Sequence, residues 1–199
     1  MNASDRVGWI WWAPGRCASR SAYAFLSHFG FTDRSAGMPP AYPGRADGYT
    51  HNVGVPAGCE SYPVMMQVRN PYSRLVSMWR LDCLSDHLPP DQAGVNFARY
   101  VEASNSLDLV AALRIRVPDV VIRQETLAED LVALPFVDLS DPSQMSLFDR
   151  HITSNRYAGA GMPGWRSHYD RRLAGMVYHA NREVFEAFGY GRDSWKGGR

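Results

Sequence analysis

The stretch Trp9–Leu26, WIWWAPGRCASRSAYAFL, decides the fold of this chain. It completes an apolar run, Val7–Trp12, that stops at a Pro-Gly pair, and such a run is typical of a strand buried on both faces. After the turn, apolar residues recur at helical spacing, at Ala22, Phe25, Leu26 and Phe29. Gly30 then marks the expected end of the helix. The stretch therefore predicts a strand, a tight loop and a helix.

The loop of this unit is built from small and basic residues. Small side chains let successive backbone N–H groups converge on one point, and the N-terminus of the following helix adds a partial positive charge. This combination favours phosphate or sulfate as the ligand. The residues that we expect to contact the anion are Arg16, Cys17, Ala18, Ser19, Arg20 and Ser21.

The loop differs from the P-loop of nucleoside triphosphatases, G-x-x-x-x-G-K-[ST]. Five positions after Gly15 stands Arg20, followed by Ser21, without the Gly-Lys pair. A later apolar run, 64–68, ends in Arg69, where a magnesium-binding aspartate would be expected. Both differences argue against metal-dependent triphosphate chemistry, so the sequence predicts no metal site.

Length and composition set further bounds. The 199 residues predict a single domain, 1–199. Because 21 Lys and Arg face 20 Asp and Glu, the formal net charge is only +1, and no global field recruits nucleic acid or an anionic membrane. Three cysteines at spacings that match no zinc or disulfide framework indicate reduced thiols. The start of the chain lacks the pattern of a signal peptide or membrane span. We therefore expect a soluble, cytoplasmic protein.

A second strand and helix unit begins at VMMQV, 64–68. Asn70 can cap the helix that follows, with Pro71 at its first position. Its apolar face is expected at Tyr72, Leu75, Val76 and Trp79.

A third unit begins with DVVIRQE, 119–125, and continues into a helix that we expect Thr126 and Glu129 to open as a capping box. The pattern also predicts a final amphipathic helix over 170–188 that stops at Gly189. The remaining expectations are surface loops at 31–48 and 135–165, a short strand at 48–53, and helices at 96–102 and 107–114.

Strands that alternate with helices predict an α/β fold. The expected architecture is a three-layer α/β/α arrangement around a central parallel sheet with right-handed crossovers. Ligands of such folds bind at the carboxyl ends of the strands, which is where the anion loop would lie.

Two motifs resemble those of the PAPS-dependent sulfotransferases, whose donor is 3′-phosphoadenosine-5′-phosphosulfate. RNPYSRLVSMW, Arg69–Trp79, matches the 3′-phosphate motif R-[DN]-P-x-x-R-x-x-S-x-[YW] at every fixed position. PGRCASRS is similar to the 5′-phosphosulfate loop P-K-T-[AG]-S-[TS]-S if one glycine is inserted and Arg16 stands for the lysine. Downstream, VIRQETLAEDL and FEAFGY resemble further family segments. The resemblance implies the P-loop-NTPase-like sulfotransferase fold.

The resemblance also assigns roles to residues. It implies that Arg69 and Ser77 bind the 3′-phosphate of the donor. Arg16 would contact the 5′-phosphosulfate and stabilise the charge that grows on the bridging oxygen, with Arg20 as a rival for this role. Arg156 would contact a donor phosphate, and Asn155 and Arg166 are further possible contacts. For Arg74, a structural ion pair and a ligand contact both remain open.

The acceptor hydroxyl needs a general base within hydrogen-bond reach. Family members use a histidine or a glutamate between the two anion motifs. His51 lies in the expected second strand, 48–53, where the resemblance places the base, and is the expected base, with Glu60 as the carboxylate alternative. The sequence thus predicts an enzyme that moves a sulfuryl group from PAPS to a hydroxyl acceptor, a carbohydrate or a small molecule. Two alternatives stay open: a divergent nucleotide or nucleoside kinase, and a non-catalytic domain that binds an adenine nucleotide.

Overall fold

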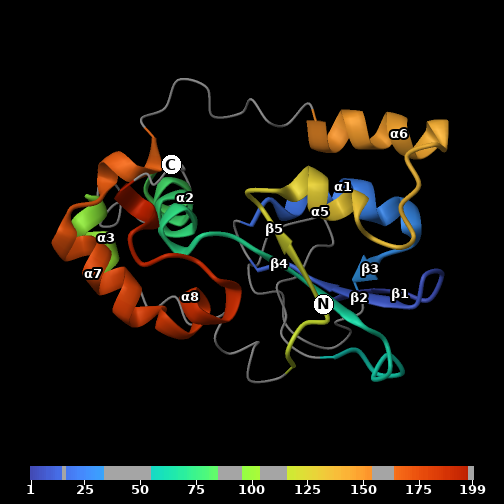
Figure 1. Cartoon of the computed structure of the whole chain (residues 1–199), viewed down its shortest axis with the longest axis horizontal. Helices are drawn as coiled ribbons and strands as arrows, with labels where there is room; N and C mark the ends of the chain where they lie inside the picture. The colour runs from blue at the N-terminus through green and yellow to red at the C-terminus, as the bar shows by residue number, and fades with distance from the viewer. Residues whose placement is uncertain (15–16, 34–54, 85–95, 104–115, 154–163, 197–199) are drawn as a thin grey trace. The chain divides into compact units, whose positions relative to one another are not determined.

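A computed structural model describes residues 1–14, 17–33, 55–84, 96–103, 116–153 and 164–196 of the chain (Figure 1). The chain divides into two compact units, Met1–Val68 with Ala111–Ala160 and Arg69–Val110 with Gly161–Arg199. Each unit has an apolar core of its own. The single domain expected from the length stays a prediction.

The first unit is built on a five-stranded sheet in the order β3-β1-β2-β4-β5 (Figure 1). The strands are β1 Asn2–Ser4, β2 Trp9–Trp12, β3 Thr32–Asp33, β4 Val64–Val68 and β5 Val120–Arg123. β2, β4 and β5 are parallel, with Trp11 opposite Met65 and Gln67 opposite Ile122. β1 is antiparallel to both of its neighbours, β2 and β3. The fold is therefore α/β with a mixed sheet.

The expected central parallel sheet is present in β2, β4 and β5, but β1 adds an antiparallel strand beside β2. Gly8, with φ +68°, helps to turn the chain back, and its N–H donates to Ser4 O over 2.9 Å. The Ser4 hydroxyl donates to Phe29 O over 2.6 Å and so ties the hairpin to the end of the first helix. The sequence of β1, Asn-Ala-Ser, has no alternation of apolar and polar residues that would predict a strand, although all three residues are buried. β3 likewise lies in a range that was expected to be loop.

One face of this sheet is covered by helices (Figure 1). α1, Ser19–Leu26, continues into a 3-10 turn, η1, Ser27–Phe29, and Gly30 ends it with φ +83°, as the sequence predicts. The core beneath joins Trp11 and Met65 of the sheet to Phe25 of α1. Phe25 lies edge-on to Phe29 and Phe148, with centroid distances of 5.4 and 5.5 Å.

The predicted surface loop at 135–165 contains a helix instead. α6, Pro142–Phe148, continues into a π-helical turn, η2, Asp149–Thr153. Asp141 caps α6 by accepting from Ser143 N over 2.8 Å, and Pro142 occupies the first turn. The Asp-Pro pair is thus a helix start, although the surrounding polar residues favoured a loop.

Thr126 occupies the N-cap position of α5, Leu127–Val132, as predicted, but the capping box is not formed as expected. The Thr126 side chain makes no cap bond. Its hydroxyl lies 3.0 Å from Asp130 Oδ2, which also accepts from Arg123 N over 2.6 Å. Asp130 engages the threonine hydroxyl and joins the end of β5 to α5.

The second unit is helical in its described part. Its elements are α2 Pro71–Leu84, α3 Phe97–Ala103, η4 Trp165–His168, α7 Arg171–Ala180, α8 Arg182–Phe188 and η5 Ser194–Lys196. The core is aromatic: Tyr72 packs edge-on against Tyr169 and Phe185, with centroid distances of 5.1 and 4.9 Å. The Tyr169 hydroxyl also donates to Tyr72 O over 2.8 Å, which links the chain before α7 to α2.

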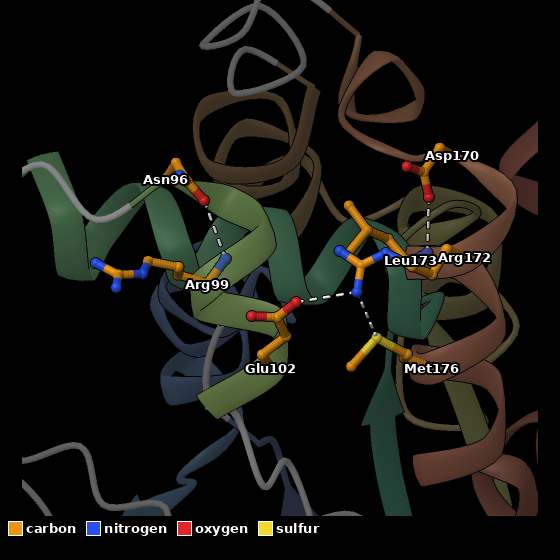
Figure 2. A network of polar contacts seen from close by, with 7 residues as sticks. All are labelled: Asn96, Arg99, Glu102, Asp170, Arg172, Leu173 and Met176. Carbon is orange, nitrogen blue, oxygen red and sulfur yellow. Dashed lines mark hydrogen bonds and ion pairs between the residues drawn. The ribbon is translucent and has the colours of Figure 1, made fainter.

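Polar contacts join α3 and α7 on the surface of this unit, as Figure 2 shows. Arg172 Nη1 lies 2.9 Å from Glu102 Oε1 and 3.7 Å from the sulfur of Met176. The two helices also begin at side-chain caps, since Asn96 accepts from Arg99 N and Asp170 accepts from Leu173 N. The ion pair is exposed and therefore contributes little to stability.

The final helix, expected as one element over 170–188, is broken in two at Asn181. Asn181 has φ −119° and ψ +21°, outside the helical region, and its side-chain Nδ2 donates to Val177 O over 3.0 Å. Asparagine side chains compete with backbone groups in this way, which is why they interrupt helices. Gly189 ends α8 in the left-handed conformation, φ +69°, as expected.

Two predicted elements, the strand at 48–53 and the helix at 107–114, lie outside the described residues. Within the described ranges, no helix combines the length and the apolar character that crossing a bilayer requires. The three-layer arrangement stays a prediction.

Candidate functional site

The loop after β2 enters α1 through a left-handed residue. Cys17 is fully buried, and Ala18 has φ +60° and ψ +26°. Among the described residues, Ala18 is the only one other than glycine with positive φ. This conformation costs an alanine roughly 1 kcal/mol. Strain of this kind concentrates at ligand sites, where the rest of the structure holds it in place.

The first turn of α1 presents backbone donors that the helix itself does not use. The first bond along the helix runs from Ala22 N to Ala18 O, 3.3 Å, so the N–H groups of residues 18–21 have no partner within it. No side chain caps α1. A left-handed residue followed by the helical Ser19 turns successive N–H groups toward one point, which suits an oxyanion. Arg20 is exposed and Ser21 half-buried on this turn.

A buried side chain from the neighbouring strand holds this loop. Gln67 of β4 donates its Nε2 hydrogen to Cys17 O. Gln67 was not among the residues expected at the site. It is nevertheless the only polar residue in the run VMMQV, and a polar residue in a buried strand is a recognisable signal.

In the second unit, the sulfotransferase-like motif forms the start of α2. Asn70 caps the helix, because its Oδ1 accepts from Tyr72 N over 3.0 Å, and Pro71 occupies the first position. Both features agree with the sequence prediction. Asn70 Nδ2 also donates to Ser194 Oγ over 2.8 Å. This bond fastens residues 192–196, here called the C-terminal segment, to the cap.

The motif arginine lies along the first turn of α2. Arg69 Nε donates to Ser73 Oγ over 2.8 Å, and the Ser73 hydroxyl donates to Asn70 O over 3.1 Å. Positions 69, 73 and 77 are four residues apart, so they form one row along the helix. The half-buried Ser77 is the next member of this row, on the face along which Arg69 runs. The two residues expected to bind the 3′-phosphate thus share a helix face.

Tyr72 and Ser73 occupy variable positions of the motif: Tyr72 was expected only on the apolar face of the helix, and Ser73 was not expected to take part in the site. The Tyr72 hydroxyl donates to Arg192 O over 2.7 Å. Burial, with a further contribution from the nearby Asp193, raises the pKa of Tyr72 to about 12, so the hydroxyl stays protonated and remains a donor. Tyr72 therefore anchors the C-terminal segment beside the motif.

Arg166, also in the second unit, lies near the cap of α2. Its Nε donates to Ser194 O over 3.3 Å, and its guanidinium lies 4.4 Å from the centroid of the Trp165 ring. Since the Ser194 hydroxyl accepts from Asn70, Arg166 and the cap of α2 meet at one residue. Arg74, by contrast, is only 2% exposed on α2, which favours the structural role over a ligand contact.

Glu60, the alternative base, lies in the turn before β4. Its Oε1 accepts from Gly58 N over 3.1 Å. Because β2 and β4 are parallel, this turn is at the amino edge of the sheet, whereas Cys17 is at the carboxyl edge. The length of β4, roughly 16 Å, separates the two edges. This placement disfavours Glu60 as a partner of the anion loop.

The other predicted site residues, Arg16, His51, Asn155 and Arg156, lie outside the described residues, and their roles stay predictions. Within the described ranges, no three His, Cys, Asp or Glu side chains gather closely enough to hold a metal ion. Comparison of the chain with protein-family models, with curated proteins and with solved structures finds no match.

Proposed function

We propose that this chain is a sulfotransferase that uses PAPS as donor and a hydroxyl compound, a carbohydrate or a small molecule, as acceptor. The observation that carries the proposal is the motif Arg69–Trp79, which matches the family pattern at every fixed position. The row of Arg69, Ser73 and Ser77 on α2 supports it, because a guanidinium and hydroxyls on one face suit a phosphate. The proposal includes the three-layer, P-loop-like fold of that family.

Each anion of the donor has a separate set of ligands in this proposal. The loop that ends in Cys17 and Ala18 binds the 5′-phosphosulfate with the backbone N–H groups of residues 18–21, helped by Arg16 or Arg20. Arg69 and Ser77 bind the 3′-phosphate, and Arg156 and Arg166 are further cationic contacts. A metal ion is not part of the scheme, because arginines and backbone donors supply the positive charge.

The reaction is an in-line displacement at sulfur. The bond between sulfur and the oxygen that bridges to the 5′-phosphate breaks as a bond from sulfur to the acceptor oxygen forms. His51 takes the acceptor proton, and the released oxygen stays on adenosine 3′,5′-bisphosphate, where Arg16 stabilises its charge. Positioning and electrostatics supply most of the acceleration of such a transfer, as for phosphoryl groups. Removing one such charged donor raises the barrier by about 3–4 kcal/mol.

Isothermal titration tests the donor assignment. The purified chain is titrated with adenosine 3′,5′-bisphosphate, AMP and magnesium-ATP. We expect the bisphosphate to bind most tightly, and Arg69→Ala to weaken its binding roughly ten- to hundredfold, since a charge-assisted hydrogen bond is lost. Arg99→Ala, which removes an exposed arginine of α3, is the matched control and leaves binding unchanged.

The outcomes separate the proposal from its alternatives. Tighter binding of magnesium-ATP than of the bisphosphate would identify a kinase-like protein and refute the sulfotransferase. Tight bisphosphate binding without transfer of labelled sulfate from PAPS to any of a panel of hydroxyl acceptors would indicate a non-catalytic binding domain. Transfer that is lost in His51→Ala while bisphosphate binding persists supports the proposed base.

A further inference from the structure

Gln67 is a polar residue buried in an apolar environment. It is 0% exposed and lies opposite Ile122 of β5. Side chains alternate along a strand, so it shares the core-facing side of β4 with Met65, and both Met65 and Ile122 belong to the apolar core under α1. Burying an amide there is unfavourable unless its polar atoms are bonded.

Only one end of this amide has a partner among the described residues. Nε2 donates to Cys17 O, and the buried Oε1 has no partner in the described part of the chain. The orientation is chemically determined, because exchanging the two ends would place Oε1 against the carbonyl oxygen of Cys17. Buried polar atoms without partners are rare and point to a role beyond packing.

The bond to Cys17 fixes the direction of the next backbone donor. No peptide of the described chain is cis, and in a trans peptide the C=O and N–H bonds point in opposite directions. Because Cys17 O points to the buried Gln67, the N–H of Ala18 points away from Gln67. The left-handed conformation of Ala18 then brings the N–H groups of Ser19 and Arg20 toward the same side.

We infer that Gln67 is a positioning residue of the anion loop: its amide holds the peptide between Cys17 and Ala18 so that the N–H groups of residues 18–20 face the bound oxyanion. The inference deepens the proposed function, in which that oxyanion is the 5′-phosphosulfate of the donor. The geometry itself applies to any sulfate or phosphate group in the loop. Gln67 touches the loop and acts on the anion only through the loop backbone.

The test compares Gln67→Met with the wild-type chain. Methionine has a similar volume and keeps the site apolar, so the fold is retained while the donor is lost. Gln124→Met is the matched control, because Gln124 follows β5 at the same edge of the sheet and is only half-buried. Sodium sulfate is titrated into each protein, and the amide NMR signals of residues 18–21 are followed.

We expect sulfate to shift these signals in the wild-type and control proteins with the same affinity. In Gln67→Met the affinity falls about three- to tenfold, the effect of one lost hydrogen bond. Calorimetry gives a second readout: the variant weakens binding of AMP and adenosine 3′,5′-bisphosphate and leaves adenosine 3′-monophosphate unaffected. A loss of stability alone would not distinguish between the 5′- and 3′-phosphates.

Gln67→Glu adds a pH-dependent variant that does not depend on the methionine substitution. A carboxyl group can donate to Cys17 O only while it is protonated, and burial favours the protonated form. Sulfate keeps its charge in this range, so its affinity for this variant rises as the pH falls from about 8 to about 5, more steeply than for the wild-type chain. An equal pH dependence in both proteins would contradict the inference.

The outcomes for the inference and for the proposed function differ. If sulfate perturbs residues 18–21 and Gln67→Met weakens it, the positioning role holds even where adenosine 3′,5′-bisphosphate does not bind and the sulfotransferase proposal fails. If the bisphosphate binds but Gln67→Met binds sulfate and AMP like the wild-type chain, the positioning role is refuted and the proposed function stands. If sulfate leaves residues 18–21 unperturbed in the wild-type chain, the positioning role is refuted as well.

Discussion

The cap of α2 makes two bonds whose loss can be separated by mutation. Asn70 is 6% exposed, its Oδ1 accepts from Tyr72 N over 3.0 Å, and its Nδ2 donates to Ser194 Oγ over 2.8 Å. Asn70→Ala removes both bonds. A lost N-cap costs about 1 kcal/mol and a lost side-chain hydrogen bond about 1 kcal/mol, so we expect a loss of about 2 kcal/mol in the free energy of unfolding.

Asn70→Ser divides this loss. Serine is a good cap but is too short to reach Ser194, so we expect this variant to lose only about 1 kcal/mol. Ser194→Ala breaks the same bond from the other side and is also expected to lose about 1 kcal/mol. The double variant Asn70→Ser with Ser194→Ala should lose no more than either single change, since the bond is already absent.

Urea unfolding followed by tryptophan fluorescence measures these free energies. The m-value should be the same in all variants, which shows that each unfolds in the same transition. The coupling energy from the double-mutant cycle should be about 1 kcal/mol. Losses that add in the double variant would show that Asn70 and Ser194 do not interact, and the description of the C-terminal segment as fastened to the motif would then be wrong. An equal loss in Asn70→Ala and Asn70→Ser would refute the capping role.

Two further predictions concern single residues. Burial, then the neighbouring Arg80, lowers the pKa of His168, whose Nε2 lies 3.1 Å from Arg80 Nη2. The unfolded chain therefore takes up a proton near the ordinary histidine pKa while the folded chain does not, so stability falls as the pH drops from that value through the lowered pKa. Urea unfolding across this range checks it, and His168→Gln should remove this part of the pH dependence. Ala18→Gly should leave stability unchanged or raise it by up to about 1 kcal/mol, because the left-handed strain disappears. Ala18→Val should destabilise the chain, and thermal melts of the two variants that rank the other way would contradict the assigned conformation.

The sequence predicted those helices and strands that have both a regular spacing of apolar residues and a capping or breaking residue at one end. β2 ends at the Pro-Gly pair, α2 begins at Asn70 and Pro71, and Gly30 ends the helix after the anion loop, all as expected. In each case the boundary residue has a conformational preference of its own that tertiary contacts do not oppose.

Elements set by long-range contacts were not predicted. β1 is a strand because its three residues pair with β2 and β3, although its own letters favour no strand. Local side-chain contacts were missed as well: Thr126 is a cap residue by type, but its hydroxyl bonds to Asp130, four residues along the chain. The same limit applies to the site: the motif identified Arg69, whereas Ser73, which holds Arg69 Nε, stood at a variable position.

The residues that support the two anion motifs share one chemical feature, which bears on the kind of ligand. Gln67 holds the loop with a neutral amide, Ser73 holds Arg69 with a hydroxyl, and Asn70 closes the cap with another amide. A carboxylate in place of Ser73 would neutralise Arg69, and one in place of Gln67 would add negative charge beside the backbone donors of the loop, so a polyanionic ligand would meet a weaker positive field. The neutral supporting groups add no negative charge of their own beside the arginine or the backbone donors. Each of the two sets of residues, taken by itself, is suited to a dianion, which is the form in which the proposed donor would present its phosphosulfate and its 3′-phosphate.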